Sequence, residues 1–338
     1  MRRSWVPLLA IAGLAGAAPH PLRGEEPWHD PSPHRVLFIQ IAPDVTLEVL
    51  DWGGRGPAVV LLAGLGTTAH VYDDFAPKLA GEFHVWGITR RGFGASSQPA
   101  AGYDPTSLAA DVLEVLDSLG LAQVNLVGHS LAGEELTEIA ASHPERVSKL
   151  VYLDSAYDFL GFLQFMRENP WPHLDPPTVA DQATPKARLD WEQKAFGYRR
   201  PEADLRATVV FGAKGFEKEV TPDSIAAAIF GGFRATPYER VTVPALAIYA
   251  TPREPSDLFP HRYESMDAPN QAAARKMTEA TIRRNQAARQ RFEHAVRQGK
   301  VLEIPGANHY VFLSNEKEVL EAVRAFLKPA APVSQPPR

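Results

Sequence analysis

The 338-residue sequence contains no cysteine. Disulfide frameworks, cysteine-ligated zinc, iron–sulfur clusters and thiol nucleophiles are therefore excluded. The chain also lacks a basic excess, because 35 Lys and Arg residues face 40 Asp and Glu residues, for a formal net charge of -5. A general nucleic-acid binder normally carries excess positive charge, so we expect no nucleic-acid partner.

Sequence patterns for bound groups are missing as well. The chain has no H-E-x-x-H motif and no clustered His/Asp spacing, so we expect no metal site. It has neither G-x-G-x-x-G after the first parallel strand nor G-x-x-x-x-G-K-S/T. Because these glycine-rich loops are what cradles a dinucleotide or a nucleotide phosphate, we expect no cofactor.

An apolar run over residues 5–18 follows the positive start Met1-Arg2-Arg3 and ends in Ala15-Gly16-Ala17. This order is typical of a secretory signal peptide, and the run is shorter than the ~20 residues that span a bilayer. We therefore expect an exported mature protein without stable membrane insertion. The expected terminal segments are a signal peptide over residues 1–18, an extended leader over 19–33 and a disordered tail over 329–338.

Between these ends, strand and helix patterns alternate. The run over residues 58–63 is continuously apolar, which is typical of a strand buried on both faces of a parallel sheet. The alternation predicts an α/β fold with a mostly parallel central sheet and helices on both faces. We expect strands at residues 36–41, 47–52, 58–63, 83–89, 124–127, 147–153, 243–250 and 301–304, and helices at 72–80, 108–119, 131–142, 270–298 and 316–327.

A sharp strand-to-helix turn is predicted at Ser130, in the sequence Gly128-His129-Ser130. The apex residue of such a turn has a strained backbone and an exposed side chain, and small neighbours such as Gly128 and Ala132 let strand and helix approach. Because a helix start favours negative charge, Ser130 is a candidate nucleophile; the alternative is a helix N-cap. The segment resembles the nucleophile elbow of the α/β-hydrolase family, in its serine-nucleophile, esterase-like branch, with Ala132 replacing the usual second glycine.

Three further segments resemble this family in the same chain order. Residues 61–66 resemble the loop that supplies one oxyanion donor, which implies a pair of backbone N–H groups from Leu65 and Leu131; a simple glycine turn is the alternative. Residues 89–96 resemble an architectural D-x-R-G-x-G-x-S loop. His309 follows the last strand, where the family places its catalytic base, and an imidazole titrates near neutral pH.

The acid of the triad stays open among three residues. Most family members carry it after the strand predicted at residues 243–250, but Arg253 stands at the commonest spacing. The family's other position, after the strand that follows the elbow helix, holds Asp154. We favour Asp154, with Glu254 and then Asp257 as alternatives; a turn cap is the structural interpretation of Asp154.

These residues favour an exported serine hydrolase that cleaves an ester or a similar acyl bond through a Ser-His-Asp triad and an acyl-enzyme. The irregular segment over residues 157–240 is expected to be a helical lid insertion over a core of residues 34–156 and 241–328. Its many aromatic residues favour a small-molecule substrate with an apolar acyl or alkyl part, or else form the lid's own core.

Two alternatives remain: the same triad used for C–C, amide or peracid chemistry, and a non-catalytic binding protein on a hydrolase scaffold. Haloalkane dehalogenases and epoxide hydrolases carry aspartate at the elbow, so Ser130 sets those branches aside. The oligomeric state is left open.

Overall fold

The computed structural model describes residues 28–328. The expected signal peptide over residues 1–18, the leader up to residue 27 and the tail over 329–338 lie outside the described residues.

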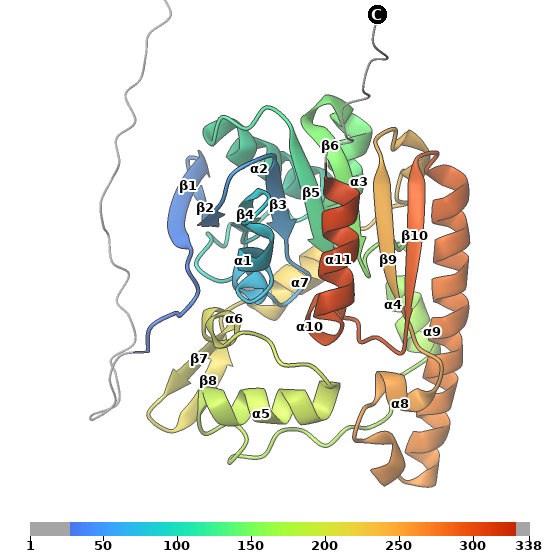
Figure 1. Cartoon of the computed structure of the whole chain (residues 1–338). Helices are drawn as coiled ribbons and strands as arrows, with labels where there is room; N and C mark the ends of the chain where they lie inside the picture. Colours follow the sequence, from blue (N-terminus) through green and yellow to red (C-terminus); the bar gives the residue numbers. More distant parts are fainter. Residues whose placement is uncertain (1–27, 329–338) are drawn as a thin grey trace, which may run out of the picture.

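An eight-stranded sheet forms the centre of the molecule, in the order β1-β2-β4-β3-β5-β6-β9-β10 (Figure 1). Strand β2 pairs antiparallel with β1 and β4, and the other pairs are parallel. The strands are β1 Arg35–Ala42, β2 Val45–Gly53, β3 Ala58–Leu62, β4 His84–Ile88, β5 Val124–His129, β6 Val147–Leu153, β9 Ala245–Thr251 and β10 Gly299–Pro305. The predicted mostly parallel sheet is confirmed, and the central strands are continuously apolar because both faces are covered.

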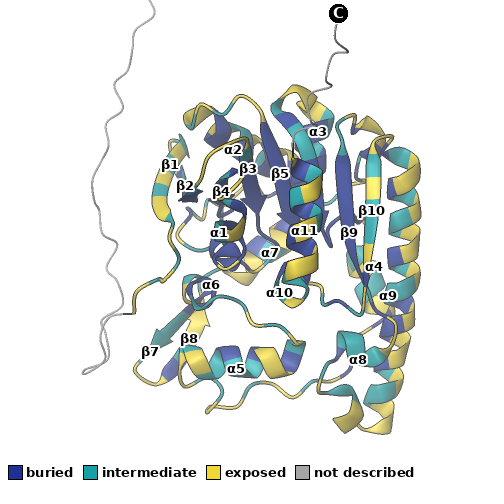
Figure 2. Ribbon diagram, in the orientation of Figure 1, coloured by how far each residue is buried: buried dark blue, intermediate teal, exposed yellow. Residues whose placement is uncertain are grey.

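Helices cover both faces of the sheet. The 3₁₀ helix η1 and helices α1, α10 and α11 share one apolar core with one face, and α2, α3 and α9 share a second core with the other. Their bounds are η1 Ala69–Tyr72, α1 Ala76–Leu79, α2 Pro105–Ser118, α3 Ala132–Ser142, α9 Ala268–Ala295, α10 Val311–Ser314 and α11 Glu316–Leu327. In Figure 2 the central strands are buried, and exposed residues lie on the outer sides of the helices. Among residues 28–328, no helix combines the length and apolarity needed to cross a membrane.

The segment between β6 and β9 contains a small second sheet, although we expected helices alone. Its elements are α4 Phe162–Glu168, α5 Pro185–Phe196, α6 Glu202–Thr208, β7 Val209–Gly212, β8 Gly215–Glu219 and α7 Asp223–Gly231. The β7–β8 hairpin turns tightly because Gly215 takes a φ of +100°. Figure 1 shows α5 and this hairpin beyond one end of the central sheet.

Two contacts fix this segment on the core. Buried Asp204 of α6 accepts hydrogen bonds from the backbone N–H and the hydroxyl of Thr68, both at 2.8 Å. On the other side, Phe165 packs with Phe259 and with Met277 of α9. The segment is therefore held from both sides of the sheet end.

Candidate active site

Ser130 occupies a sharp turn between β5 and α3. Its φ of +53° lies in the left-handed region, which costs an L-residue roughly 1–2 kcal/mol. A Cβ on Gly128 would lie 2.6 Å from a Leu136 methyl carbon and 2.9 Å from the Ala132 Cβ, so the close crossing of strand and helix requires glycine there. The same crossing requires Gly133, where a Cβ would lie 2.0 Å from the carbonyl oxygen of Ser155.

A path of hydrogen bonds leads from this turn to the end of β6. The Ser130 Oγ lies 2.9 Å from the His309 Nε2, and the His309 Nδ1 lies 2.6 Å from the Asp154 Oδ2. Since a carboxylate only accepts, the proton sits on Nδ1 and donates to Asp154. Nε2 is then free to accept the serine hydroxyl proton.

Asp154 is held by further donors at its second oxygen. Its Oδ1 accepts the backbone N–H of Ala250 at 2.9 Å and the hydroxyl of Tyr157. The carboxylate is buried, with 6% of its side chain exposed, whereas the His309 side chain is 47% exposed. The acid is thus fixed inside the protein, while the imidazole faces outward toward Ser130.

The other two candidates for the acid, Asp257 and Glu254, do not lie in hydrogen-bond contact with His309 among the described residues. Asp257 accepts the backbone N–H of Arg253 at 2.8 Å and pairs with its guanidinium. Glu254 immediately precedes the short helix α8, Pro255–Leu258. Within residues 28–328, no hydrogen bond joins either carboxylate to His309.

The loop after β3 lies directly against the nucleophile. A Cβ on Gly64 would lie 3.1 Å from the Ser130 Cβ and 2.8 Å from the His129 Nδ1. Leu65 and Leu131 join the same small apolar cluster. Their backbone N–H groups, at the loop and at the start of α3, make no hydrogen bond among the described residues. Backbone N–H groups without a protein partner are the type of donor that can stabilise a developing oxyanion.

A buried ion pair holds this loop in place. Arg90 pairs with Glu135 of α3, and its Nη2 donates to the Ala63 carbonyl at 2.8 Å while Nη1 donates to that of Gly64 at 3.3 Å. The sequence predicts an architectural role for the loop over residues 89–96 but does not indicate this ion pair. Tyr157 was not predicted either; the spacing Asp154-x-x-Tyr157 was the available signal.

His129 supports the loop that carries His309. Its Nε2–H donates to the His309 carbonyl at 3.1 Å, and its ring packs against those of His309 and Tyr310. Burial, with the nearby His309 as a smaller cause, lowers the pKa of His129 well below its ordinary value. His129 is therefore neutral and positions the neighbouring backbone.

Known proteins resemble this chain in sequence and in fold. The sequence model of the alpha/beta hydrolase fold family matches residues 57–213. A fluoroacetate dehalogenase from Burkholderia sp is 37% identical over 116 residues, which is 33% of this chain and 38% of the relative. A pimeloyl-acyl-carrier-protein methyl ester esterase from Aeromonas hydrophila is 35% identical over 130 residues, 38% of this chain and 46% of that one. The matches thus cover less than half of each relative.

Solved structures resemble the chain over much more of its length. The crystal structure of E-2-(acetamidomethylene)succinate hydrolase superposes with a TM-score of 0.62 at 20% identity, covering 87% of this chain and 99% of the other. A probable hydrolytic enzyme from Pseudomonas aeruginosa PAO1 gives a TM-score of 0.63 at 20% identity, covering 90% and 97%. The chain therefore has the alpha/beta hydrolase fold.

Proposed function

We propose that the protein is a serine hydrolase that cleaves an ester or a similar acyl bond through an acyl-enzyme. One observation carries the proposal: the hydrogen-bond path from the Ser130 Oγ through the His309 ring to the buried Asp154 carboxylate. The names of relatives, which include an esterase and hydrolases, support hydrolysis in general. Although one relative is named a dehalogenase, this chain has Ser130 where haloalkane dehalogenases carry aspartate.

In the first half-reaction the Ser130 Oγ attacks the acyl carbonyl carbon as His309 Nε2 takes the hydroxyl proton. Asp154 stabilises the imidazolium through the Nδ1 hydrogen bond. The carbonyl oxygen gains the negative charge and accepts the N–H groups of Leu65 and Leu131. One such donor typically contributes about 10²–10³ in kcat. The C–O bond then breaks, and the leaving alcohol takes the proton from His309.

The second half-reaction repeats these steps with water. His309 Nε2 removes a proton from water, whose oxygen attacks the ester carbon of acylated Ser130. The same N–H groups hold the second oxyanion. When the bond to the Ser130 Oγ breaks, His309 returns its proton to that oxygen. The products are a carboxylic acid and the regenerated enzyme.

The surroundings of Ser130 favour an apolar acyl or alkyl part in the substrate. Leu131 packs with Phe93 and with Ile225 and Ile229 of α7. Residues of the segment 157–240 thus contribute to the apolar cluster at the nucleophile, which supports its proposed role as a lid. Most of its aromatic rings contact one another, as Phe230 does with Phe162 and Phe233, so the lid's own core takes up much of that apolar surface.

A panel of p-nitrophenyl esters of graded acyl length tests the proposal. We expect wild-type protein to hydrolyse at least the shorter members, and Ser130→Ala to lose about 10⁵-fold or more in kcat/KM. Ser142→Ala is the matched control, because this exposed hydroxyl lies at the far end of α3. Equal, slow rates for wild type and Ser130→Ala on every ester contradict the proposal.

We also propose that the protein is exported. The support is the residue pattern of the N-terminus, in which a positive start precedes the apolar run over residues 5–18. Expression of the whole chain should yield a product outside the cytoplasm whose intact mass corresponds to cleavage near Ala18. A full-length product confined to the cytoplasm contradicts export.

A further inference from the structure

Two segments that are far apart in the sequence bring four potential metal ligands together. Asp30 and His34 precede β1, and His70 and Asp73 belong to η1 and its C-terminal cap. The sequence predicts no metal site, because it has no H-E-x-x-H motif and no clustered His/Asp spacing. The fold nevertheless places one donor atom from each residue within 4.8 Å of all the others.

The donors lie close enough to share one ion. His70 Nδ1 lies 2.9 Å from Asp73 Oδ2 and 3.3 Å from Asp30 Oδ2, and His34 Nδ1 lies 3.0 Å from the other Asp73 oxygen, Oδ1. Ligands at the usual zinc distances in a tetrahedron are about 3.3 Å apart. A set of two imidazoles and two carboxylates is typical of zinc and similar divalent metals, whereas Mg²⁺ and Ca²⁺ prefer oxygen ligands.

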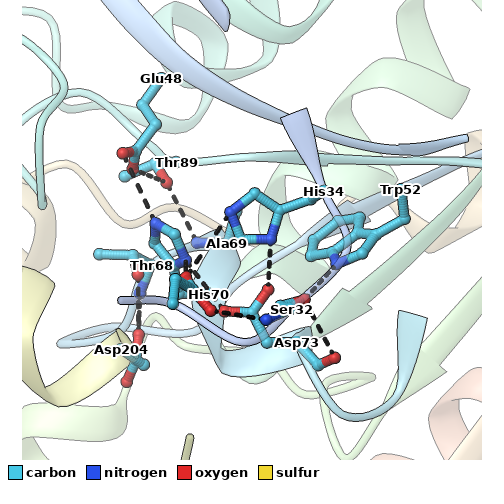
Figure 3. Close-up of polar contacts among 11 residues, drawn as sticks. Ser32, His34, Glu48, Trp52, Thr68, Ala69, His70, Asp73, Thr89 and Asp204 are labelled. Atoms are coloured by element: carbon cyan, nitrogen blue, oxygen red, sulfur yellow. Dashed lines mark hydrogen bonds and ion pairs between the residues drawn. The ribbon is translucent and has the colours of Figure 1, made fainter. Parts of the chain in front are cut away.

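Two of the donor atoms are buried without a hydrogen bond. Among residues 28–328, the His34 Nδ1 and the Asp73 Oδ1 have no hydrogen-bond partner, and their side chains are only 3% and 4% exposed. Although they are 3.0 Å apart, their relative direction is not that of a hydrogen bond. Figure 3 shows His34, His70 and Asp73 converging on one space. The two atoms thus face each other as an ion pair without a directed hydrogen bond, and a shared cation would bind both.

Outer contacts orient these ligands. The Asp30 Oδ1 accepts the backbone N–H of Ser32 at 2.9 Å. Glu48 faces the other ring nitrogen of His70 at 3.6 Å and accepts the Thr89 hydroxyl at 2.8 Å. A carboxylate behind a ligating imidazole is the usual outer partner in metal sites.

We propose that Asp30, His34, His70 and Asp73 bind one divalent metal ion, with zinc as the preferred occupant. The ion fastens the segment before β1 to η1. We assign the ion a structural role, because η1 directly follows the loop that carries Leu65. Thr68, the residue before η1, also holds α6 through its hydrogen bonds to Asp204. The proposal is independent of the proposed hydrolase activity.

The negative surroundings favour a cation at this place. Three carboxylates face the His70 ring, Asp73 at 2.9 Å, Asp30 at 3.3 Å and Glu48 at 3.6 Å. Metal ligands must give up their protons on binding, so direct measurement of a bound metal separates an occupied site from these ion pairs alone.

The test is a metal titration of the whole 338-residue chain, purified without a polyhistidine tag and stripped with EDTA. Co²⁺ reports its geometry through the visible absorption of a tetrahedral site, and Zn²⁺ is added in competition. We expect saturation at one Co²⁺ per chain, displacement by Zn²⁺, no effect of Mg²⁺, and a higher Tm with Zn²⁺ bound.

His34→Gln and Asp73→Asn should each weaken Co²⁺ binding by at least about 100-fold. Loss of a residue that only supports a ligand costs up to that much, and these two substitutions remove a ligand itself. His143→Gln is the matched control, because it alters an exposed His–carboxylate pair. Failure of wild-type protein to show a saturable Co²⁺ band, a result that does not depend on any variant folding, overturns the proposal. So does a band that survives unchanged in both ligand variants.

Discussion

Replacing Asp154 by asparagine should slow catalysis sharply while leaving the fold intact. Asp154 uses one oxygen for the His309 Nδ1–H and the other for the Ala250 N–H and the Tyr157 hydroxyl. An asparagine has one oxygen, so it can serve only one side. The backbone N–H of Ala250 cannot become an acceptor, and leaving it unpaired costs about 1–3 kcal/mol.

The amide of Asp154→Asn therefore turns its oxygen toward Ala250 and its NH₂ toward His309. This orientation forces the His309 proton onto Nε2, the atom that must accept the Ser130 proton. An energy difference of about 1–3 kcal/mol leaves the productive tautomer roughly 5- to 150-fold depleted. With the lost stabilisation of the imidazolium, we expect kcat to fall about 10⁴-fold, as for the same change in a known Ser-His-Asp enzyme.

The assay is the rate of p-nitrophenyl ester hydrolysis, paired with the rate at which a fluorophosphonate labels Ser130. Both rates should fall together, and thermal unfolding should show a folded variant. Asp257→Asn and Glu254→Gln are the matched controls and should keep the wild-type rate, since neither carboxylate contacts His309 among residues 28–328. If Asp154→Asn keeps more than about a tenth of the activity, or if a control loses it, the assignment of the acid is wrong.

Three further substitutions test the surroundings of the site. Arg90→Met leaves Glu135 buried without its partner and should destabilise the protein by about 3–5 kcal/mol in urea unfolding; a loss below 1 kcal/mol contradicts the clamp. Gly133→Ala places a methyl 2.0 Å from the Ser155 carbonyl and should cost about 1–3 kcal/mol, whereas an unchanged Tm contradicts the tight crossing. Burial raises the pKa of Glu134 from 4.5 to about 7, although the hydrogen bond from the Thr236 hydroxyl lowers it. The wild type should therefore lose up to about 3 kcal/mol relative to Glu134→Gln as pH rises from about 4.5 through 7, and parallel pH profiles contradict this.

The sign of the last prediction follows from proton linkage. Because the folded state binds the Glu134 proton more tightly than the unfolded chain, this stabilisation is fully present below the ordinary pKa and is lost through about pH 7. Glutamine at position 134 keeps the side-chain shape and can still accept the hydrogen bond from the Thr236 hydroxyl, but it does not titrate. Comparison of the two proteins isolates this one carboxyl from all other groups.

The sheet and the place of Ser130 could be predicted because their signals are local. Continuous apolar runs mark strands covered on both faces, and helix α11 has the predicted bounds. A glycine two residues before Ser130 marks the sharp turn. Asp154 was favoured as the acid through the resemblance, because it stands at the family's second acid position, after the strand that follows the elbow helix.

Contacts between distant segments could not be predicted. The Ala250 N–H reaches Asp154 only because β6 and β9 are neighbours. The requirement at Gly133 depends on a carbonyl from another element, and the pattern around Ser130 pointed to Ala132 instead. The β7–β8 hairpin was missed because its strands are short and lie within a region of mixed pattern.

The four proposed metal ligands illustrate the same limit. Asp30 with His34 and His70 with Asp73 are ordinary pairs at helical spacing, and each alone has a surface interpretation. Their convergence depends on how the segment before β1 folds against η1. The spacing of residues along the sequence does not show that the segment before β1 contacts η1.

The nucleophile is identified by covalent labelling with a fluorophosphonate, followed by peptide mass spectrometry. We expect a single adduct on the peptide that contains Ser130 at neutral pH, absent from Ser130→Ala and strongly slowed in His309→Gln. An unlabelled wild-type protein, or an adduct on another serine, contradicts it.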